Sequence, residues 1–282
     1  MVVLVTTAQL SKLHGTGNDF LVTTAALDAR DAVALCDRFT GIGADGLLLL
    51  GPGRDGADAT MTLYNADGSV AEMSGNGIRC LAWLARREGL GTLDRLVVNT
   101  GGGRRTVDLE LDTSGSVTDA TCDMGAVTFT PSEIPIAPDR ATQIPVELDG
   151  VAVDADAAGM GNPHLVVFVD DPGLVDVARH GSRLETDERF PNRINVEFVR
   201  VEDRTHVRMR VWERGVGETQ SCGTGACAVA AVAHRRELVG ASVSVAVSGG
   251  VLRVELGETI RLGGPVVHVF DLSVDVDEWR AR

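Results

Sequence analysis

Lysine is almost missing from this chain. Of the 26 basic side chains only Lys12 is a lysine, and the others are arginines. Enzymes that use pyridoxal phosphate hold the cofactor on a lysine as a Schiff base. Lys12 lies in the N-terminal segment SKLHGTGNDF, where a structural role is the default interpretation. We therefore expect chemistry that needs no pyridoxal phosphate.

Cysteines and basic clusters are equally sparse. The five cysteines include no C-x-x-C pair, and their spacing fits neither a disulfide framework nor a zinc site. We expect reduced thiols, no metal, and for all but Cys222 the role of a small buried hydrophobic residue. The net charge of −14 and the lack of basic runs with interleaved aromatics disfavour nucleic acid as a partner.

Long apolar runs are missing as well. No stretch reaches the roughly 18 apolar residues of a membrane span, and the start MVVLVTTAQLSK has neither the basic region nor the cleavage site of a leader peptide. We expect a soluble cytoplasmic protein that contacts no membrane.

An internal duplication is the main positive feature of the sequence. GTGNDFLV (15–22) resembles GMGNPHLV (159–166), and LYNADGSVAEMSGNGIRCLAWLARR (63–87) aligns with VWERGVGETQSCGTGACAVAAVAHR (211–235) at nearly the same separation. Arg38-Phe39 and Arg189-Phe190 form a third, weaker pair. The alignment places Ser74 on Cys222 and Asn65 on Glu213, which predicts two homologous halves that face each other.

Hydrophobic periodicity predicts the fold of each half. The runs TVDLELD, HVRMRVW, SVSVAVS and GVLRVEL alternate with the period of strands, whereas ACAVAAVA (226–233) is apolar on all sides, as in a buried helix. We expect an α/β (α+β) protein with two pseudo-symmetric domains, each a curved, mainly antiparallel sheet or barrel around a central helix. The first domain covers 1–124 and is completed by 269–282, and the second covers 125–268.

Two glycine-rich turns open helices at matching places in the repeat. Ser74-Gly75-Asn76-Gly77 and Cys222-Gly223-Thr224-Gly225 each put an acid/base or nucleophilic side chain at a helix N-terminus, where unpaired N–H groups and the helix dipole favour an anion. If both turns meet at one cleft, an α-amino acid carboxylate fits between them. Its α-carbon then lies between two proton-transfer groups. We also expect the helix terminus to lower the pKa of the Cys222 thiol.

The motifs resemble those of the diaminopimelate epimerase family along the whole chain. The matching segments, in the family's order, are KLHGTGNDF, CDRFTGIGADG, YNADGSVAEMSGNG, MGNPH, FPNRINVEF and WERGVGETQSCGTGACA. The resemblance implies cofactor-independent epimerisation of LL-diaminopimelate to meso-diaminopimelate for lysine and peptidoglycan synthesis, in a homodimer. It also implies that Cys222 and the residue at position 74 exchange protons with the substrate.

The resemblance further assigns residues to substrate binding and to support of the reacting groups. Arg214 and the asparagines take the distal amino-acid end, and main-chain groups of the two turns hold the reacting carboxylate. An arginine fork suits a carboxylate, and Glu213 suits an ammonium. His164 and Glu213 are supporting residues. The implied binding residues are Asn18, Asn65, Gly75, Asn76, Asn162, Asn195, Glu213, Arg214, Gly223 and Thr224.

One motif has a competing interpretation. Gly41-Ile-Gly43-Ala-Asp-Gly46 matches the dinucleotide pattern G-x-G-x-x-G, but an apolar run follows it. A nicotinamide site needs a strand before the turn and a helix after it. We therefore interpret this motif as a turn and expect no nicotinamide cofactor.

Ser74 departs from the family, which has a cysteine at this position. A serine hydroxyl is a much weaker acid than a thiol. Three explanations stay open: a natural functional serine with altered rate or substrate, an engineered replacement, and loss of catalysis in a protein that binds a bis-amino acid. Racemisation of another amino acid such as histidine, and the chemistry of proline-racemase-like or phenazine-pathway isomerases, are alternative functions.

Overall fold

The protein is described by a computed structural model that covers residues 7–92, 94–137 and 139–280. The first six residues, part of the segment in which we expect no leader, lie outside this range. The chain divides into two compact units, unit 1 with residues 1–122 and 264–282, and unit 2 with residues 123–263. Within the described ranges, no helix combines the length and the apolar composition that a membrane crossing requires.

Unit 1 holds the following elements. Its strands are β1 (Thr7–Gly15), β2 (Asn18–Thr23), β3 (Gly46–Pro52), β4 (Ala59–Asn65), β5 (Val70–Ala71), β6 (Arg95–Thr100), β7 (Gly103–Leu111), β8 (Val117–Asp123) and β18 (Val267–Asp275). Its helices are α1 (Ala29–Cys36), α2 (Gly75–Arg87) and α5 (Val276–Arg280).

Unit 2 repeats this order of elements. Its strands are β9 (Ile144–Leu148), β10 (Val151–Gly159), β11 (Pro163–Phe168), β12 (Asn195–Val201), β13 (His206–Glu213), β14 (Gly217–Thr219), β15 (Ser242–Val247) and β16 (Gly250–Glu255), and β17 (Arg261–Pro265) leads back to unit 1. A short 3-10 turn, η1 (Pro172–Leu174), precedes α3 (Val177–Glu185), and α4 (Gly223–Arg235) corresponds to α2.

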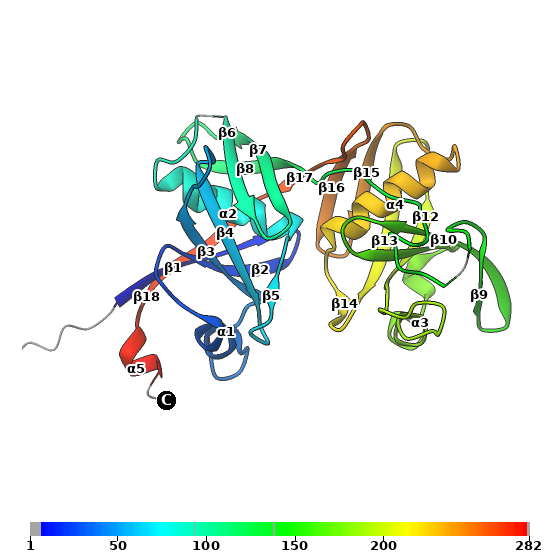
Figure 1. Ribbon diagram of the computed structural model, residues 1–282, viewed down its shortest axis with the longest axis horizontal. Coiled ribbons are helices and arrows are strands. Elements are labelled where there is room, and N and C mark those ends of the chain that lie inside the picture. Colours follow the sequence, from blue (N-terminus) through cyan, green and yellow to red (C-terminus); the bar gives the residue numbers. More distant parts are fainter. Residues whose placement is uncertain (1–6, 93, 138, 281–282) are drawn as a thin grey trace, which may run out of the picture. The chain divides into compact units, whose positions relative to one another are not determined.

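Strand pairing is the same in both units (Figure 1). In unit 1 the antiparallel groups β18–β1–β2, β3–β4–β5 and β6–β7–β8 are joined by the parallel pairs β2–β3 and β4–β6. In unit 2 the groups β9–β10–β11, β12–β13–β14 and β15–β16–β17 are joined by the parallel pairs β11–β12 and β13–β15. Each unit is therefore a mixed, mainly antiparallel sheet with helical crossovers, which confirms the predicted fold class. The sheet does not close into a barrel among the described strands.

The long helix of each unit packs against its sheet. Helix α2 contacts β1 to β4 and β7, and α4 contacts β10 to β13, β15 and β16. Residues 226–233 of α4 are all buried, as their apolar pattern predicts. The four alternating runs lie in β7, β13, β15 and β16, and the GIGADG turn continues into strand β3 and not into a helix.

Candidate active site

Ser74 and Cys222 cap their helices in the same way. Ser74 has backbone angles φ −142° and ψ 122°, and Cys222 has φ −123° and ψ 112°. The Gly77 N–H donates to Ser74 Oγ at 3.0 Å, and the Gly225 N–H donates to Cys222 Sγ at 3.4 Å. Both side chains are therefore N-caps. Each lies at the positive end of a 13-residue helix.

A hydrogen-bonded chain stands behind the Ser74 turn. Asn76 Nδ2 donates to Asn18 Oδ1 at 3.1 Å, and Arg79 donates to Asn76 Oδ1 at 2.7 Å and to the Gly75 carbonyl at 3.0 Å. Arg79 is fully buried. The structure thus brings Asn18, Gly75 and Asn76 together, and a buried guanidinium that sequence reasoning did not single out fixes two of them.

Lys12 belongs to a charge cluster that anchors Asn18. Its Nζ lies 2.5 Å from Asp19 Oδ2 and also donates to the Gly43 carbonyl. Burial alone would raise the pKa of Asp19, but the bonds from Arg38 and Lys12 outweigh it and lower that pKa to about 2. Asp45 accepts from Arg38 and from Asn18 Nδ2, each at 2.7 Å. Lys12 therefore has the structural role that the sequence predicts, and the glycine-rich turn supplies one of its acceptors.

Around Cys222, strand β13 and the α4 turn gather further polar groups. Glu213 ends β13 and accepts from Thr219 Oγ1 at 2.5 Å, and its negative charge acts on the Cys222 thiol. Thr224 Oγ1 lies 3.5 Å from Cys222 Sγ. Burial raises the pKa of Glu213. A carboxylate that binds protons more readily than usual therefore acts electrostatically on the Cys222 thiol.

The expected direction of the Cys222 pKa is wrong. Burial raises the pKa of this thiol well above its ordinary value, and the negative charges of Glu213 and Glu197 raise it further. The hydrogen bonds from Thr224 and the Gly225 N–H favour the thiolate, but they are the smaller effect. The helix N-terminus does not lower the pKa of the thiol overall, because the side chain is buried away from water and lies among carboxylates. Cys222 therefore rests as a neutral thiol.

His164 and Asn162 connect the same region to the sheet. His164 is fully buried on β11, its Nδ1 lies 2.7 Å from Glu197 Oε1, and its Nε2 lies 2.9 Å from Asn162 Oδ1. Asn162 Nδ2 reaches Thr224 Oγ1 at 3.4 Å. His164 therefore supports the Cys222 turn through two side chains. Glu197 was not among the predicted site residues. The signal that could have indicated it is a charged residue within the apolar run INVEFV.

Asn195 joins two segments of the unit 2 site. Its Nδ2 donates to the Pro163 carbonyl at 2.8 Å, and its Oδ1 accepts from the Arg214 N–H at 2.9 Å. The side chain is buried. Asn195 thus holds both the backbone beside Asn162 and the backbone of Arg214. It thereby positions these two predicted binding residues.

Two predicted binding residues are exposed. Arg214 extends from the turn after β13, and its guanidinium donates to the Asn192 carbonyl at 3.2 Å. Asn65 at the end of β4 donates to Ser69 Oγ at 2.9 Å within its turn. The turn that leads to β5 leaves the Asn65 side chain open to solvent.

Cys80 does not take over the place of Ser74. It lies within α2, fully buried, and burial raises the pKa of its thiol to about 12. The thiol is therefore both enclosed and hard to ionise. Position 74 keeps a hydroxyl as its only acid/base group.

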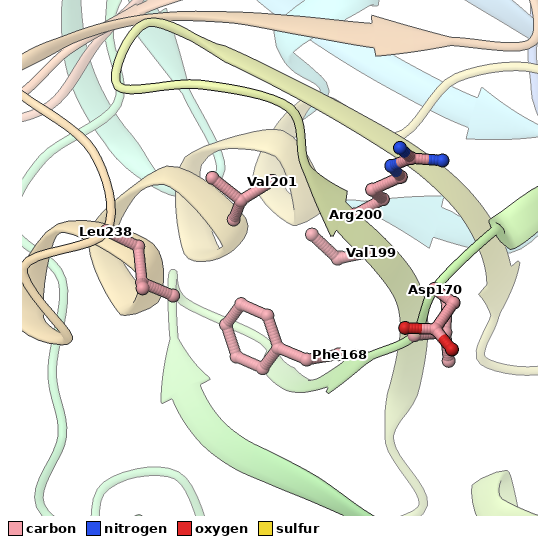
Figure 2. A pocket seen from close by; sticks show the side chains of 7 residues that line it. Phe168, Asp170, Val199, Arg200, Val201 and Leu238 are labelled. Atoms are coloured by element: carbon pink, nitrogen blue, oxygen red, sulfur yellow. The ribbon is translucent and has the colours of Figure 1, made fainter.

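A surface depression on unit 2 is separate from these motifs. It is lined by Phe168, Val169, Asp170, Val199, Arg200, Val201 and Leu238. Figure 2 shows the Phe168 ring and Leu238 at one end and the charged groups of Arg200 and Asp170 at the other. None of these seven lining residues is a predicted binding or catalytic residue, so the motifs and not this depression define the candidate site.

Solved structures define the class of protein to which this fold belongs. The fold is similar to that of a hydroxyproline epimerase from Agrobacterium vitis, with a TM-score of 0.72, 18% identity, and coverage of 96% of this chain and 93% of the other. It is also similar to a PhzF-family phenazine biosynthesis protein from Bacillus anthracis, with a TM-score of 0.68, 14% identity, and coverage of 95% and 99%. The class is thus defined by the fold that this chain shares with these two structures.

Sequence comparison then places the chain within one family. A profile of the diaminopimelate epimerases matches residues 10–130 and 157–267. The chain is 39% identical over 276 residues to the diaminopimelate epimerase of Stutzerimonas stutzeri (strain A1501), covering 94% of this chain and 98% of that protein. It is 40% identical over 278 residues to that of Acinetobacter baumannii (strain AYE), covering 95% and 97%. The protein belongs to the diaminopimelate epimerase family.

Proposed function

We propose that this protein is an isomerase that interconverts LL- and meso-diaminopimelate by proton transfer at the α-carbon. The observation that carries the proposal is the Cys222 turn. A thiol caps a buried helix, lies 3.5 Å from Thr224 Oγ1 and is acted on by the charge of Glu213, in a chain of the diaminopimelate epimerase family. The first-turn N–H groups at Gly223 and Thr224 suit the reacting carboxylate. The equivalent groups of Gly75 and Asn76 serve the same carboxylate.

The chemistry consists of one proton removed and one delivered. Cys222 rests as a thiol and donates its proton to one face of the planar α-carbon. At the opposite face Ser74 accepts the original α-proton as an alkoxide, after its hydroxyl proton has passed to solvent water. The Cys222 thiolate then regains a proton from solvent. In the reverse direction the roles exchange, and Cys222 must first lose its proton. Glu213 is the proposed acceptor of that proton, because its charge acts on the thiol and burial raises its own pKa.

The distal end of the substrate requires recognition of a second carboxylate and ammonium. Arg214 supplies a planar fork for the carboxylate, Asn195 holds its backbone at 2.9 Å, and Glu213 suits the ammonium. Asn18, Asn65 and Asn162 complete the proposed set. Lys12 is engaged with Asp19 and is not available for a Schiff base, which supports a reaction independent of pyridoxal phosphate.

The cellular setting follows from the surface and the thiols. All five cysteines are buried, and none forms a disulfide within the described part of the chain, which suits a reducing cytoplasm. The charge of −14 disfavours nucleic acid as a partner.

Strand β18 exposes Val267, Val269 and Phe270, and its described pairing is with β1 alone. A strand with an exposed apolar edge suits a homodimer. Light scattering of Phe270→Asp beside the unmodified protein tests this assembly: an unchanged dimer would place the interface elsewhere.

The decisive experiment follows both stereochemistry and hydrogen exchange. Stereochemically pure diaminopimelate is incubated with the protein in heavy water, and isomer composition and α-deuterium content are measured over time. Inversion accompanied by solvent deuterium at the inverted carbon is the expected result. Binding without exchange or inversion would instead indicate a non-catalytic member of the family.

A further inference from the structure

Glu197 occupies a position that the fold itself does not require to be charged. In the parallel pairs, His164 lies opposite Asn195 on β12 as Phe20 lies opposite Gly46 on β3. This register places Glu197 at the position of Leu48. A Cβ added to Gly225 would lie 2.7 Å from Glu197 Oε1, and one added to the matching Gly77 would lie 3.4 Å from Leu48 Cδ2. Unit 2 therefore has a His–Glu pair where unit 1 has a buried Phe–Leu pair.

The Glu197 carboxylate is completely enclosed. The side chains of Glu197 and His164 are each 0% exposed, and Oε1 lies 2.7 Å from His164 Nδ1. Glu197 Oε2 has no hydrogen-bond partner among the described residues. Burying a charged pair is costly when apolar side chains can fill the same space. The matched Phe20 and Leu48 show that they can, so we look for a functional reason for the pair.

The second ring nitrogen of His164 indicates that reason. Nδ1 faces a carboxylate oxygen and Nε2 faces Asn162 Oδ1 at 2.9 Å. A histidine that faces an acceptor at both nitrogens donates from both, and this requires the charged ring. The negative Glu197 beside it compensates that charge at a fully buried position. The carboxylate thus favours a histidine that can only donate.

The doubly donating ring and the orientation of the Asn162 amide belong to one arrangement, in which Glu197 holds the ring and the ring holds the amide. Oδ1 must accept from the ring, so Nδ2 points away from it, and one of its hydrogens reaches Thr224 Oγ1 at 3.4 Å. The other hydrogen is available to an acceptor on the substrate. In a flipped amide two donors would face each other at His164. Asn162 is therefore fixed as a donor, which suits a carboxylate and not an ammonium.

We propose, on the basis of the proposed function, that Glu197 is a positioning residue of the epimerase: through His164 it orients the Asn162 amide so that this side chain donates to a substrate carboxylate. The negative charge of Glu197 has a second effect, since after burial and Glu213 it also helps to raise the pKa of Cys222. Both effects act through other groups, and Glu197 itself touches no substrate atom.

The first test replaces Glu197 by its isosteric amide. In long-range proton–nitrogen NMR spectra at neutral pH, the His164 ring, assigned by its loss in His164→Phe, is expected to be doubly protonated in the unmodified protein and singly protonated in Glu197→Gln. The KM for diaminopimelate should rise about 10- to 100-fold, as expected for one lost hydrogen bond to a charged group, with a smaller change in kcat. The matched control is Asp156→Asn, a buried carboxylate of unit 2 that pairs with Arg236 at 2.7 Å.

A second variant keeps the proposal testable if Glu197→Gln does not fold. Glu197→Leu with His164→Phe rebuilds the apolar pair of unit 1, and such replacements are often tolerated. It should fold and show the same rise in KM. A singly protonated His164 in the unmodified protein, or an unchanged KM in a folded variant, would overturn the role of Glu197. The ring measurement needs no substrate, so failure of the unmodified protein to act on diaminopimelate would count against the proposed function alone.

Discussion

Exchanging the Ser74 hydroxyl for a thiol tests how far the departure at this position limits catalysis. Ser74 and Cys222 have nearly the same backbone angles, and Cys222 already shows that sulfur accepts the third N–H of such a turn, at 3.4 Å. A cysteine at position 74 therefore fits the turn without rearrangement. We expect Ser74→Cys to fold and to epimerise diaminopimelate faster.

The size of the gain follows from the two roles of the side chain. As an N-cap, Ser74 accepts from the Gly77 N–H at 3.0 Å, and a weaker sulfur acceptor should cost at most about 1 kcal/mol of unfolding free energy. A well-matched proton-transfer group contributes about 10²- to 10⁴-fold to the rate. Because the enzyme cannot change the equilibrium between isomers, Ser74→Cys must raise kcat/KM in both directions by the same factor, which we expect to be about 100-fold.

Hydrogen exchange separates the two reacting groups. Cys222 can take and return a proton at one face without inversion, so deuterium should enter one isomer faster than that isomer inverts. The raised pKa of Cys222 means that its thiolate becomes more abundant as pH rises towards that pKa, and this exchange should accelerate accordingly. The rates are read by NMR in heavy water and by chiral chromatography of the isomers.

Ser74→Asn is the matched control, because asparagine is as good an N-cap as serine but supplies no hydroxyl. It should unfold at the same denaturant concentration as the unmodified protein and lose any inversion to which the hydroxyl contributes. Equal inversion rates for the unmodified protein and Ser74→Cys would refute the reasoning and show that serine is a fully competent partner here.

Three further predictions concern the binding, stability and cofactor independence of the protein. Arg214→Ala should weaken diaminopimelate binding by about 2–5 kcal/mol and leave alkylation of Cys222 unchanged; equal affinity by calorimetry would show that Arg214 faces elsewhere. Asp19→Asn should lower unfolding free energy at pH 7 by about 2 kcal/mol, since the pKa of Asp19 is about 2 against an ordinary 3.8. That difference should shrink as pH falls from about 4 towards 2, and a pH-independent loss in denaturant titrations would contradict it. Activity should survive dialysis against chelator with no pyridoxal or nicotinamide absorption, whereas recovery on adding metal would disprove cofactor independence.

Much of the fold could be predicted because local patterns determine it. The period-two runs become β7, β13, β15 and β16, and the all-apolar segment of α4 is buried. A short stretch of similar sequence was less informative about how far its side chains are buried. Phe39 and Phe190 occupy matching dipeptides, yet Phe39 is 98% exposed and Phe190 only 3%, because their surroundings differ in ways that a dipeptide does not contain.

The chemistry of the site depends on contacts that sequence order hides. The motif around Cys222 identifies the thiol but not its proton affinity, because the carboxylates that act on it come from β12 and β13. Glu197 and Arg79 lie within apolar stretches of the sequence, and only the packed sheet shows which groups they contact. The sequence therefore indicates candidate reacting residues, whereas their ionisation depends on contacts that only the fold brings together.

The two halves share a backbone but differ in what lies behind each helix cap. Behind Ser74 the duplicated framework carries Phe20, Leu48 and a buried Arg79 that donates to the first turn. Behind Cys222 the carboxylates of Glu197 and Glu213 raise the pKa of the thiol. An epimerase needs two proton-transfer groups in opposite protonation states at any moment, and a symmetrical pair would have no built-in preference. The duplication supplies two equivalent positions, and the buried carboxylates behind Cys222 make them unequal by raising the pKa of its thiol.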